Sequence, residues 1–204
     1  WEANKLDEQM NVFIKYKNIA MVYSNYYFKN EIKNTEKIFY KNKLPEGNII
    51  DPLLRKHIVG LLTMVINRNF LPKNENIFDP RLHNIGDFDV AIKVCLNNKV
   101  ACVQKPLATY RWHGSNETLL SRDRQIKELE RWGNEMQRRP EVSKNKGFKK
   151  FLNDINYLKA MLLVMEGDST NAIKYLPKLS FGKEMLKLLI SILLPLSLLK
   201  QLRT

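Results

Sequence analysis

The first hundred or so residues alternate between helical and strand-like patterns of apolar and polar positions. Apolar residues recur at helical spacing among charges over residues 3–14, which predicts a short amphipathic helix. Residues 19–28, IAMVYSNYYF, are rich in β-branched and aromatic side chains and predict a buried strand. The polar stretch 29–47, which closes with Pro-Glu-Gly, is expected to form an edge strand and a loop.

The alternation continues further along the chain. Asp51 followed by proline is typical of a helix start, so a helix is expected over about 52–58 with Asp51 as its cap. The apolar stretch VGLLTMVINR at 59–68 predicts another buried strand. A turn-rich loop is expected at 72–82.

One more helix and one more strand region complete this part. Residues 89–98, DVAIKVCLNN, predict a helix capped by Asp87 or its neighbour. Residues 99–112 predict one or two short strands broken at Pro106. Helices and strands that are mixed along the chain and joined by short loops indicate an α/β domain.

The second part of the chain has only helical patterns. Residues 119–139 predict a charged helix, and residues 148–166 predict a longer amphipathic one. After a Gly-Asp turn, residues 170–179 predict a second short helix, which gives a helical hairpin. We therefore divide the chain into residues 1–118, a helical extension at 119–182 and an apolar C-terminal segment at 183–204.

The C-terminal segment has an apolar run of about 12 residues that contains a proline, whereas a helix that spans a bilayer needs about 20. Lysines and Arg203 flank this run. Two interpretations stay open: an amphipathic helix in a membrane interface, or a helix that docks on its own domain.

The net charge of +13 favours anionic partners such as nucleic acid, anionic lipid or phosphorylated ligands. The basic residues are scattered and no zinc-finger or RNP-like motif accompanies them, so we expect a solvated basic face and no nucleic-acid partner. Cys95 and Cys102 form no Cys-x-x-Cys pair, and Cys95 lies in an apolar pattern. A core position in a reducing compartment suits this pattern.

Three stretches carry the candidate chemistry: GNIIDPLLRKHIVGLLTMVINRNFL at 47–71, NIFDPRLHNIGDFDVAIKV at 76–94, and KPLATYRWHGSN at 105–116. In this order they resemble the second half of glycosyltransferase family 2 domains, which have the GT-A fold. The opening WEANKLDEQM resembles the stretch just after the acidic metal-binding motif of the family. The resemblance implies that residues 1–118 are the C-terminal portion of a GT-A (Rossmann-like) glycosyltransferase domain, followed by an α-helical tail.

The resemblance implies a role for Asp87. It matches the aspartate that deprotonates the acceptor hydroxyl as a general base. Taken alone, an aspartate here would be interpreted as a helix cap. Gly86 departs from the family, which usually has glutamate there, and this leaves the identity of the acceptor open.

The resemblance also implies binding residues. His113 matches a ligand of the Mn²⁺ or Mg²⁺ ion that holds the nucleotide diphosphate, and Arg111 is expected to neutralise phosphate. Asp89 and Trp112 are expected to contact the acceptor. Each has a structural alternative: a surface-loop histidine, a salt-bridged arginine, an aspartate that stabilises a helix dipole, and a packed tryptophan.

Other residues of the same chemical types have less support. His57 and His83 match no functional position of the family and are interpreted as structural or exposed. Tyr110 is expected either to wall the sugar or acceptor pocket or to pack in the core.

The resemblance implies inverting transfer of a sugar from a nucleotide-diphospho-sugar to a saccharide or lipid-linked acceptor, in cell-surface polysaccharide or lipopolysaccharide synthesis. The expected place is the cytoplasm, at the inner face of the membrane. The nucleotide-binding half of the family is expected before Trp1, so the isolated chain is expected to be inactive. The main alternative is a non-catalytic basic module that binds membranes or acts as a scaffold.

Overall fold

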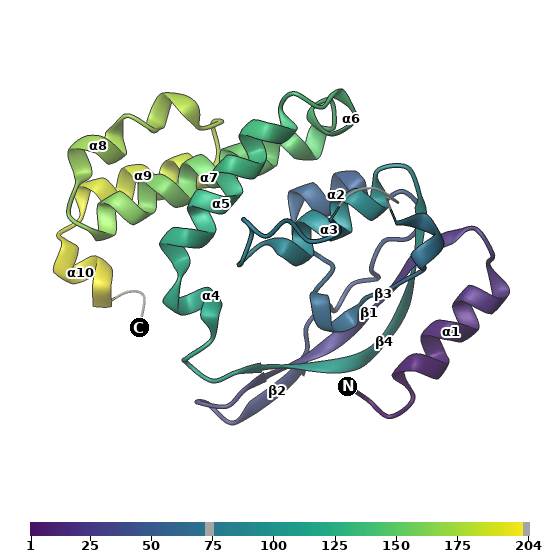
Figure 1. Ribbon diagram of the computed structural model, residues 1–204. Coiled ribbons are helices and arrows are strands. Elements are labelled where there is room, and N and C mark those ends of the chain that lie inside the picture. The colour runs from purple at the N-terminus through teal and green to yellow at the C-terminus, as the bar shows by residue number, and fades with distance from the viewer. Residues whose placement is uncertain (72–75, 202–204) are drawn as a thin grey trace. The chain divides into compact units, whose positions relative to one another are not determined.

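The computed structural model describes residues 1–71 and 76–201, and the backbone alone at 118, 200 and 201. It divides into two compact units, residues 1–125 and 126–204 (Figure 1). In the described residues every strand lies in the first unit, and the second unit is helical. The three-part division expected from the sequence stays a prediction.

The first unit is built on a mixed four-stranded sheet. Its central strand, β1 (Ile19–Asn30), pairs in parallel with β4 (Lys99–Trp112) along one edge. Along the other edge it pairs antiparallel with β3 (Val65–Ile66) and, further on, with β2 (Thr35–Ile38). This mixed α/β architecture is compatible with part of a Rossmann-like glycosyltransferase domain.

Burial explains the composition of β1. Four consecutive residues, Ala20 to Tyr23, have no exposed surface, and Ser24 and Asn25 are also buried. A strand that is covered on both faces carries a continuous apolar run instead of an alternating one. The predicted strand at 19–28 is thus confirmed, and it extends by two residues.

Helices cover both faces of this sheet. Figure 1 shows α1 (Lys5–Lys15) on one side, and α2 (Ile50–Arg55) and α3 (Gly86–Cys95) on the other. The predicted helix at 3–14 is confirmed as α1. Cys95 and Cys102 are both free and buried, as expected for Cys95, and burial raises the pKa of each thiol to about 12.

Polar contacts fasten α1 to the sheet. The side chain of Gln9 is fully buried, and its Nε2 donates to the carbonyl oxygens of Val22 at 2.9 Å and Thr63 at 2.8 Å. Its Oε1 accepts from the buried ammonium of Lys5 at 2.5 Å. Burial lowers the pKa of Lys5, because the charged form is costly away from water. Gln9 therefore links the helix to β1 and to the segment before β3.

The predicted strand at 59–68 is wrong for most of its length. The chain there forms 3-10 turns η1 (Leu61–Thr63) and η2 (Arg68–Phe70) around the two residues of β3. Side chains bond locally instead: the Thr63 hydroxyl donates to the Gly60 carbonyl at 2.7 Å, and such bonds compete with strand pairing. Part of the loop predicted at 72–82 lies outside the described residues.

Both helix caps proposed from the sequence are wrong. Helix α2 begins at Ile50, so Asp51 lies in its first turn and pairs with Arg55 at 2.6 Å. Helix α3 begins at Gly86, so Asp87 also lies in a first turn. In both helices an isoleucine stands at the cap position, and the aspartates instead face the positive end of the helix dipole.

The chain does not break at Pro106. Strand β4 is continuous, and its pairing with β1 shifts from Ser24 opposite Val103 to Asn25 opposite Pro106. Proline has no N–H for a ladder bond, and a bulge is one of the places where a strand tolerates it. The expectation of one or two short strands broken at Pro106 is therefore wrong about the break: residues 99–112 form one long strand with an irregularity in register.

The second unit is a set of packed helices, preceded in the chain by α4 (Glu117–Leu120). Its elements are α5 (Arg122–Met136, which begins in the first unit), α6 (Pro140–Ser143), α7 (Lys146–Met165), α8 (Ser169–Ile173), η3 (Leu176–Lys178), α9 (Lys183–Leu193) and α10 (Leu196–Gln201). The helix predicted at 148–166 is confirmed as α7, and α5 forms most of the one predicted at 119–139. The single helix predicted at 170–179 is wrong, because the chain there forms the short α8 and then η3.

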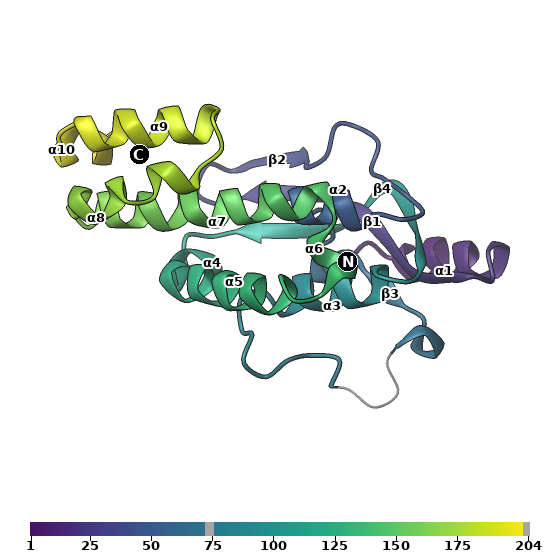
Figure 2. The same cartoon turned by 90° about the horizontal axis from the view of Figure 1, so that it is seen from above.

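The packing of the second unit is apolar. Trp132 of α5 contacts Phe151 of α7 edge-on, with ring centroids 5.1 Å apart. A core cluster that includes Met161 and Leu188 joins α7 to the helices that follow, and Figure 2 shows α9 alongside α7. None of the helices in the described parts of the chain is long and apolar enough to cross a lipid bilayer.

We predict that Gln9→Met lowers the free energy of unfolding by about 2–3 kcal/mol, because buried polar partners then lose their hydrogen bonds. Urea unfolding measures the change. Gln137→Met, at an exposed glutamine after α5, is the matched control and is expected to stay within about 0.5 kcal/mol of wild type. Equal effects of the two substitutions would contradict the linking role of Gln9.

Candidate functional site

A pocket of about 650 Å³ opens in the first unit, toward the carboxyl ends of β1 and β4. Parallel strands commonly bind ligands at this edge. The wall combines aromatic, charged and backbone-exposing residues from five parts of the chain. It consists of Trp1, Tyr26, His57, Gly60, Leu61, Leu62, Asp87, Thr109, Tyr110 and Arg111.

Asp87 enters this pocket from the first turn of α3. Its Oδ1 accepts the backbone N–H of Phe88 at 2.8 Å, and its side chain is 23% exposed. The carboxylate lies near the N-terminal end of the helix, where acidic side chains are commonly found. A partly buried carboxylate that faces a pocket has the chemistry required to take a proton from a bound hydroxyl.

His57 stands next to this carboxylate. Its Nε2 lies 3.8 Å from Oδ2 of Asp87, and its ring meets the Phe88 ring edge-on with centroids 5.3 Å apart. The expectation that His57 is structural or exposed missed its place on the pocket wall, although the side chain is indeed 38% exposed. The only signal in the sequence was its location in the first of the three stretches that resemble the family.

Arg111 reaches the same pocket from the end of β4. Its Nε donates to Oε1 of Glu31 at 2.7 Å. This contact raises the pKa of Arg111 and lowers the pKa of Glu31. A guanidinium has five N–H donors, so this one bond leaves it able to bind a phosphate as well. The salt-bridged and the phosphate-binding interpretations of Arg111 are therefore compatible.

The other predicted site residues lie outside the pocket wall. Asp89 is buried, and its Oδ2 pairs with the ammonium of Lys93 one turn along α3, at 2.8 Å. Trp112 packs near Phe28, with ring centroids 6.1 Å apart. The acceptor contacts expected of Asp89 and Trp112 stay predictions.

His113 follows β4 on an exposed loop. Its Nδ1 lies 2.8 Å from the Ser115 hydroxyl, and its backbone N–H donates to Asn116. Within residues 1–71 and 76–201, no three histidine, cysteine, aspartate or glutamate side chains gather in a group that could hold a metal ion. These residues do not form a metal site by themselves, and the metal-binding role of His113 stays a prediction.

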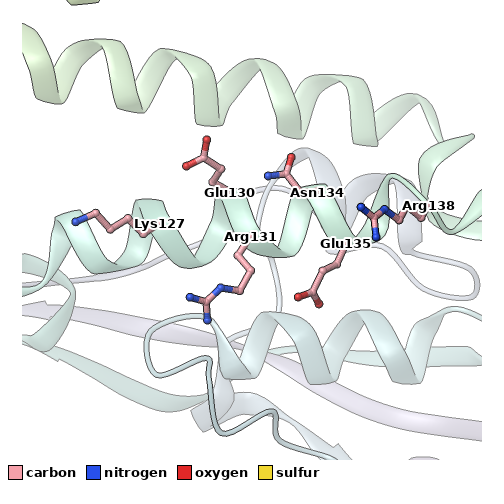
Figure 3. Close-up of a pocket in the computed structure, with 6 residues that line it drawn as sticks. All are labelled: Lys127, Glu130, Arg131, Asn134, Glu135 and Arg138. Carbon is pink, nitrogen blue, oxygen red and sulfur yellow. The ribbon is translucent and has the colours of Figure 1, made fainter.

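A second, smaller hollow of about 330 Å³ lies along α5. Its lining comes from α5 and from the turn just after it: Lys127, Glu130, Arg131, Asn134, Glu135 and Arg138. Figure 3 shows Glu130 and Asn134 on one side of α5, with Arg131 and Glu135 on the opposite side. Glu130 pairs with Lys159. The charged groups do not converge on one point, so the pocket beside Asp87 is the better candidate site.

Comparison with curated proteins finds a distant relationship to a glycosyltransferase. Over 132 residues the chain is 29% identical to the UDP-Glc:alpha-D-GlcNAc-diphosphoundecaprenol beta-1,3-glucosyltransferase WfgD of Escherichia coli. The match covers 64% of this chain and 47% of that protein, so it spans about half the length of the curated relative. No protein-family profile matches the chain, and no solved structure matches it significantly.

We predict that Arg111→Gln raises the pKa of Glu31 toward the value of an ordinary glutamate, because the guanidinium is the main cause of the lowered pKa. A carboxyl-carbon NMR titration measures it. Arg122→Gln, at an exposed arginine at the start of α5, is the control and is expected to leave the pKa of Glu31 unchanged. A Glu31 pKa that does not respond to Arg111→Gln contradicts the ion pair.

Proposed function

We propose that this chain carries the acceptor-side portion of a family 2 glycosyltransferase with the GT-A fold, and that Asp87 is its general base. The main support for this proposal is the position of Asp87. It lies in the first turn of α3 and lines a pocket at the carboxyl ends of two parallel strands. The distant relationship to a glucosyltransferase supports the same class of reaction.

In the proposed reaction an acceptor hydroxyl attacks the anomeric carbon of a nucleotide-diphospho-sugar. Asp87 takes the hydroxyl proton as the new C–O bond forms, and the old C–O bond breaks with its electron pair on the departing nucleoside diphosphate. One base and one in-line displacement invert the anomeric configuration. The hydrogen bond from the Phe88 N–H orients the carboxylate.

Arg111 has the position to bind the departing diphosphate, since it lines the same pocket as Asp87. The resemblance to the family also implies Mn²⁺ or Mg²⁺, which would neutralise diphosphate charge, with His113 as one ligand. No step is assigned to the metal, because the described residues contain no group of ligands for it.

The acceptor side of the pocket is aromatic. Tyr26 and Tyr110 line it, and Phe28 stacks on Tyr110 with ring centroids 6.0 Å apart. Trp112 lies next to Phe28 and so extends the group of aromatic side chains beyond the pocket wall. We propose that it contacts an acceptor long enough to reach past the wall. Asp89 would act through its ion pair with Lys93, which holds the first turn of α3.

The relative is named for an acceptor that carries N-acetylglucosamine on diphosphoundecaprenol. By analogy we propose a saccharide or lipid-linked acceptor for this chain as well. Its role would then be in cell-surface polysaccharide or lipopolysaccharide synthesis, at the inner face of the membrane. A non-catalytic basic module is the alternative.

The role of Asp87 as general base is tested by measuring sugar transfer by the complete gene product that contains these residues. Asp87→Asn is expected to lower kcat by about 10²–10⁴-fold, the usual contribution of a general base, and to leave donor binding unchanged. A panel of nucleotide-diphospho-sugars with a diphosphate-linked N-acetylglucosamine acceptor provides the assay, and calorimetry provides the donor Kd.

Asp51→Asn is the matched control, because Asp51 also lies in the first turn of a helix in this unit but outside the pocket wall. It is expected to change kcat by less than about twofold, as for a surface site without such a role. Turnover by Asp87→Asn at the wild-type rate would refute the assignment. No turnover by wild type with any donor favours the non-catalytic alternative.

The neighbour of the base has its own test. We predict that His57→Phe, which keeps an aromatic ring against Phe88 but removes Nε2, lowers kcat about tenfold without changing the KM of the donor. His83→Phe, an exposed histidine outside the pocket wall, is the control. A change in KM with an unchanged kcat would indicate a packing role only.

A further inference from the structure

Helix α9 is apolar on two opposite faces. One face packs inward: Leu188 is fully buried and Ser191 is nearly so. At 3.6 residues per turn, Leu186, Ile190 and Leu193 share the other face, and they are 50%, 57% and 82% exposed. A helix on the surface of a water-soluble unit normally turns a polar face outward, so this exposed apolar stripe needs an explanation.

Positive charge borders the stripe. Lys183 and Lys187 lie one turn apart, beside Leu186 and Ile190 on the helix surface, and both are exposed. The one acidic residue of α9, Glu184, is half-buried and turned toward Lys150, 3.4 Å away. The outward face of α9 therefore combines large apolar side chains with lysines only.

The segment before the helix carries another exposed apolar side chain. Phe181 is 87% exposed two residues before α9 begins. Figure 2 shows α9 along one side of the helical unit, next to α7 and α8. The apolar stripe lies on the side of the helix opposite to its core contacts.

We propose that the outward face of α9, formed by Leu186, Ile190 and Leu193 with Lys183 and Lys187, docks on an anionic lipid surface. The helix would lie in the plane of the membrane, with the apolar side chains at the boundary of the acyl chains and the ammonium groups on lipid phosphates. The proposal does not depend on the reaction proposed for the pocket.

The positive charge of the outward face of α9 favours an anionic lipid surface, and not a second copy of the chain, as its binding partner. Two copies joined through this face would bring four exposed lysines together, in molecules that each carry a net charge of +13. An anionic bilayer offers apolar and negatively charged layers at the same surface, which matches both kinds of side chain.

Vesicle flotation with the full 204-residue chain tests the apolar stripe. Wild type is expected to float with vesicles that contain phosphatidylglycerol, and to bind pure phosphatidylcholine vesicles far less. Ile190→Glu is expected to lower the partition coefficient about tenfold or more, through lost apolar burial and added repulsion. Ile173→Glu, at a half-exposed isoleucine of α8, is the matched control and is expected to bind like wild type.

The lysines have a separate test. Replacing Lys183 and Lys187 together with glutamine is expected to weaken binding to phosphatidylglycerol vesicles about tenfold or more, at roughly 1 kcal/mol per lysine. The same change at Lys41 and Lys43, which are exposed in the first unit, removes equal charge and is expected to have little effect.

Three results would overturn the proposal. If wild type floats with neither kind of vesicle, a lipid surface is excluded as the partner of α9. A dimer in light scattering that Ile190→Glu dissociates, without flotation, assigns the face to a second copy. A lower melting temperature for Ile190→Glu but not for Ile173→Glu, again without flotation, shows that the chain itself covers the face.

Discussion

The parallel pairing of β1 with β4 is the constraint on which the first unit depends. Because the two strands run in the same direction, their carboxyl ends meet at one edge of the sheet, and Tyr26, Tyr110 and Arg111 reach a common pocket there. Helix α3 packs on β1 and brings Asp87 to the same edge. The strand can hold this central position because residues 20–25 are buried, and Met21 and Val22 pair with β3 on one side and β4 on the other.

The elements with a clear hydrophobic period were predictable, and those fixed by local hydrogen bonds were not. The patterns at 3–14, 19–28 and 148–166 identified two helices and a buried strand, but the apolar stretch at 59–68 has no period that separates a strand from 3-10 turns. Within the site, Asp87 and Arg111 were indicated by motif order. His57 was not, because its closeness to Asp87 arises only when α2 and α3 pack together.

The polar contacts of α1 give a physical reason for residues that the resemblance had only matched. Trp1 lines the pocket, and the Lys5 ammonium lies 4.6 Å from the centre of its ring. Lys5 in turn donates to Gln9, which holds the carbonyls of β1 and η1. The buried amide, the ammonium and the indole thus form one connected path from the sheet to the pocket wall, which no propensity scale would reveal.

The bulge at Pro106 has a consequence for how this site tolerates change. Successive strand residues face opposite sides, and β4 advances three positions, from Pro106 to Thr109, where β1 advances two, from Asn25 to Tyr27. This irregularity determines on which face of the sheet the side chains of Thr109, Tyr110 and Arg111 lie. The number of residues in β4 before the pocket therefore determines which side of the sheet the wall residues face. A one-residue deletion there would turn their side chains to the opposite side of the sheet, although no wall residue itself is changed.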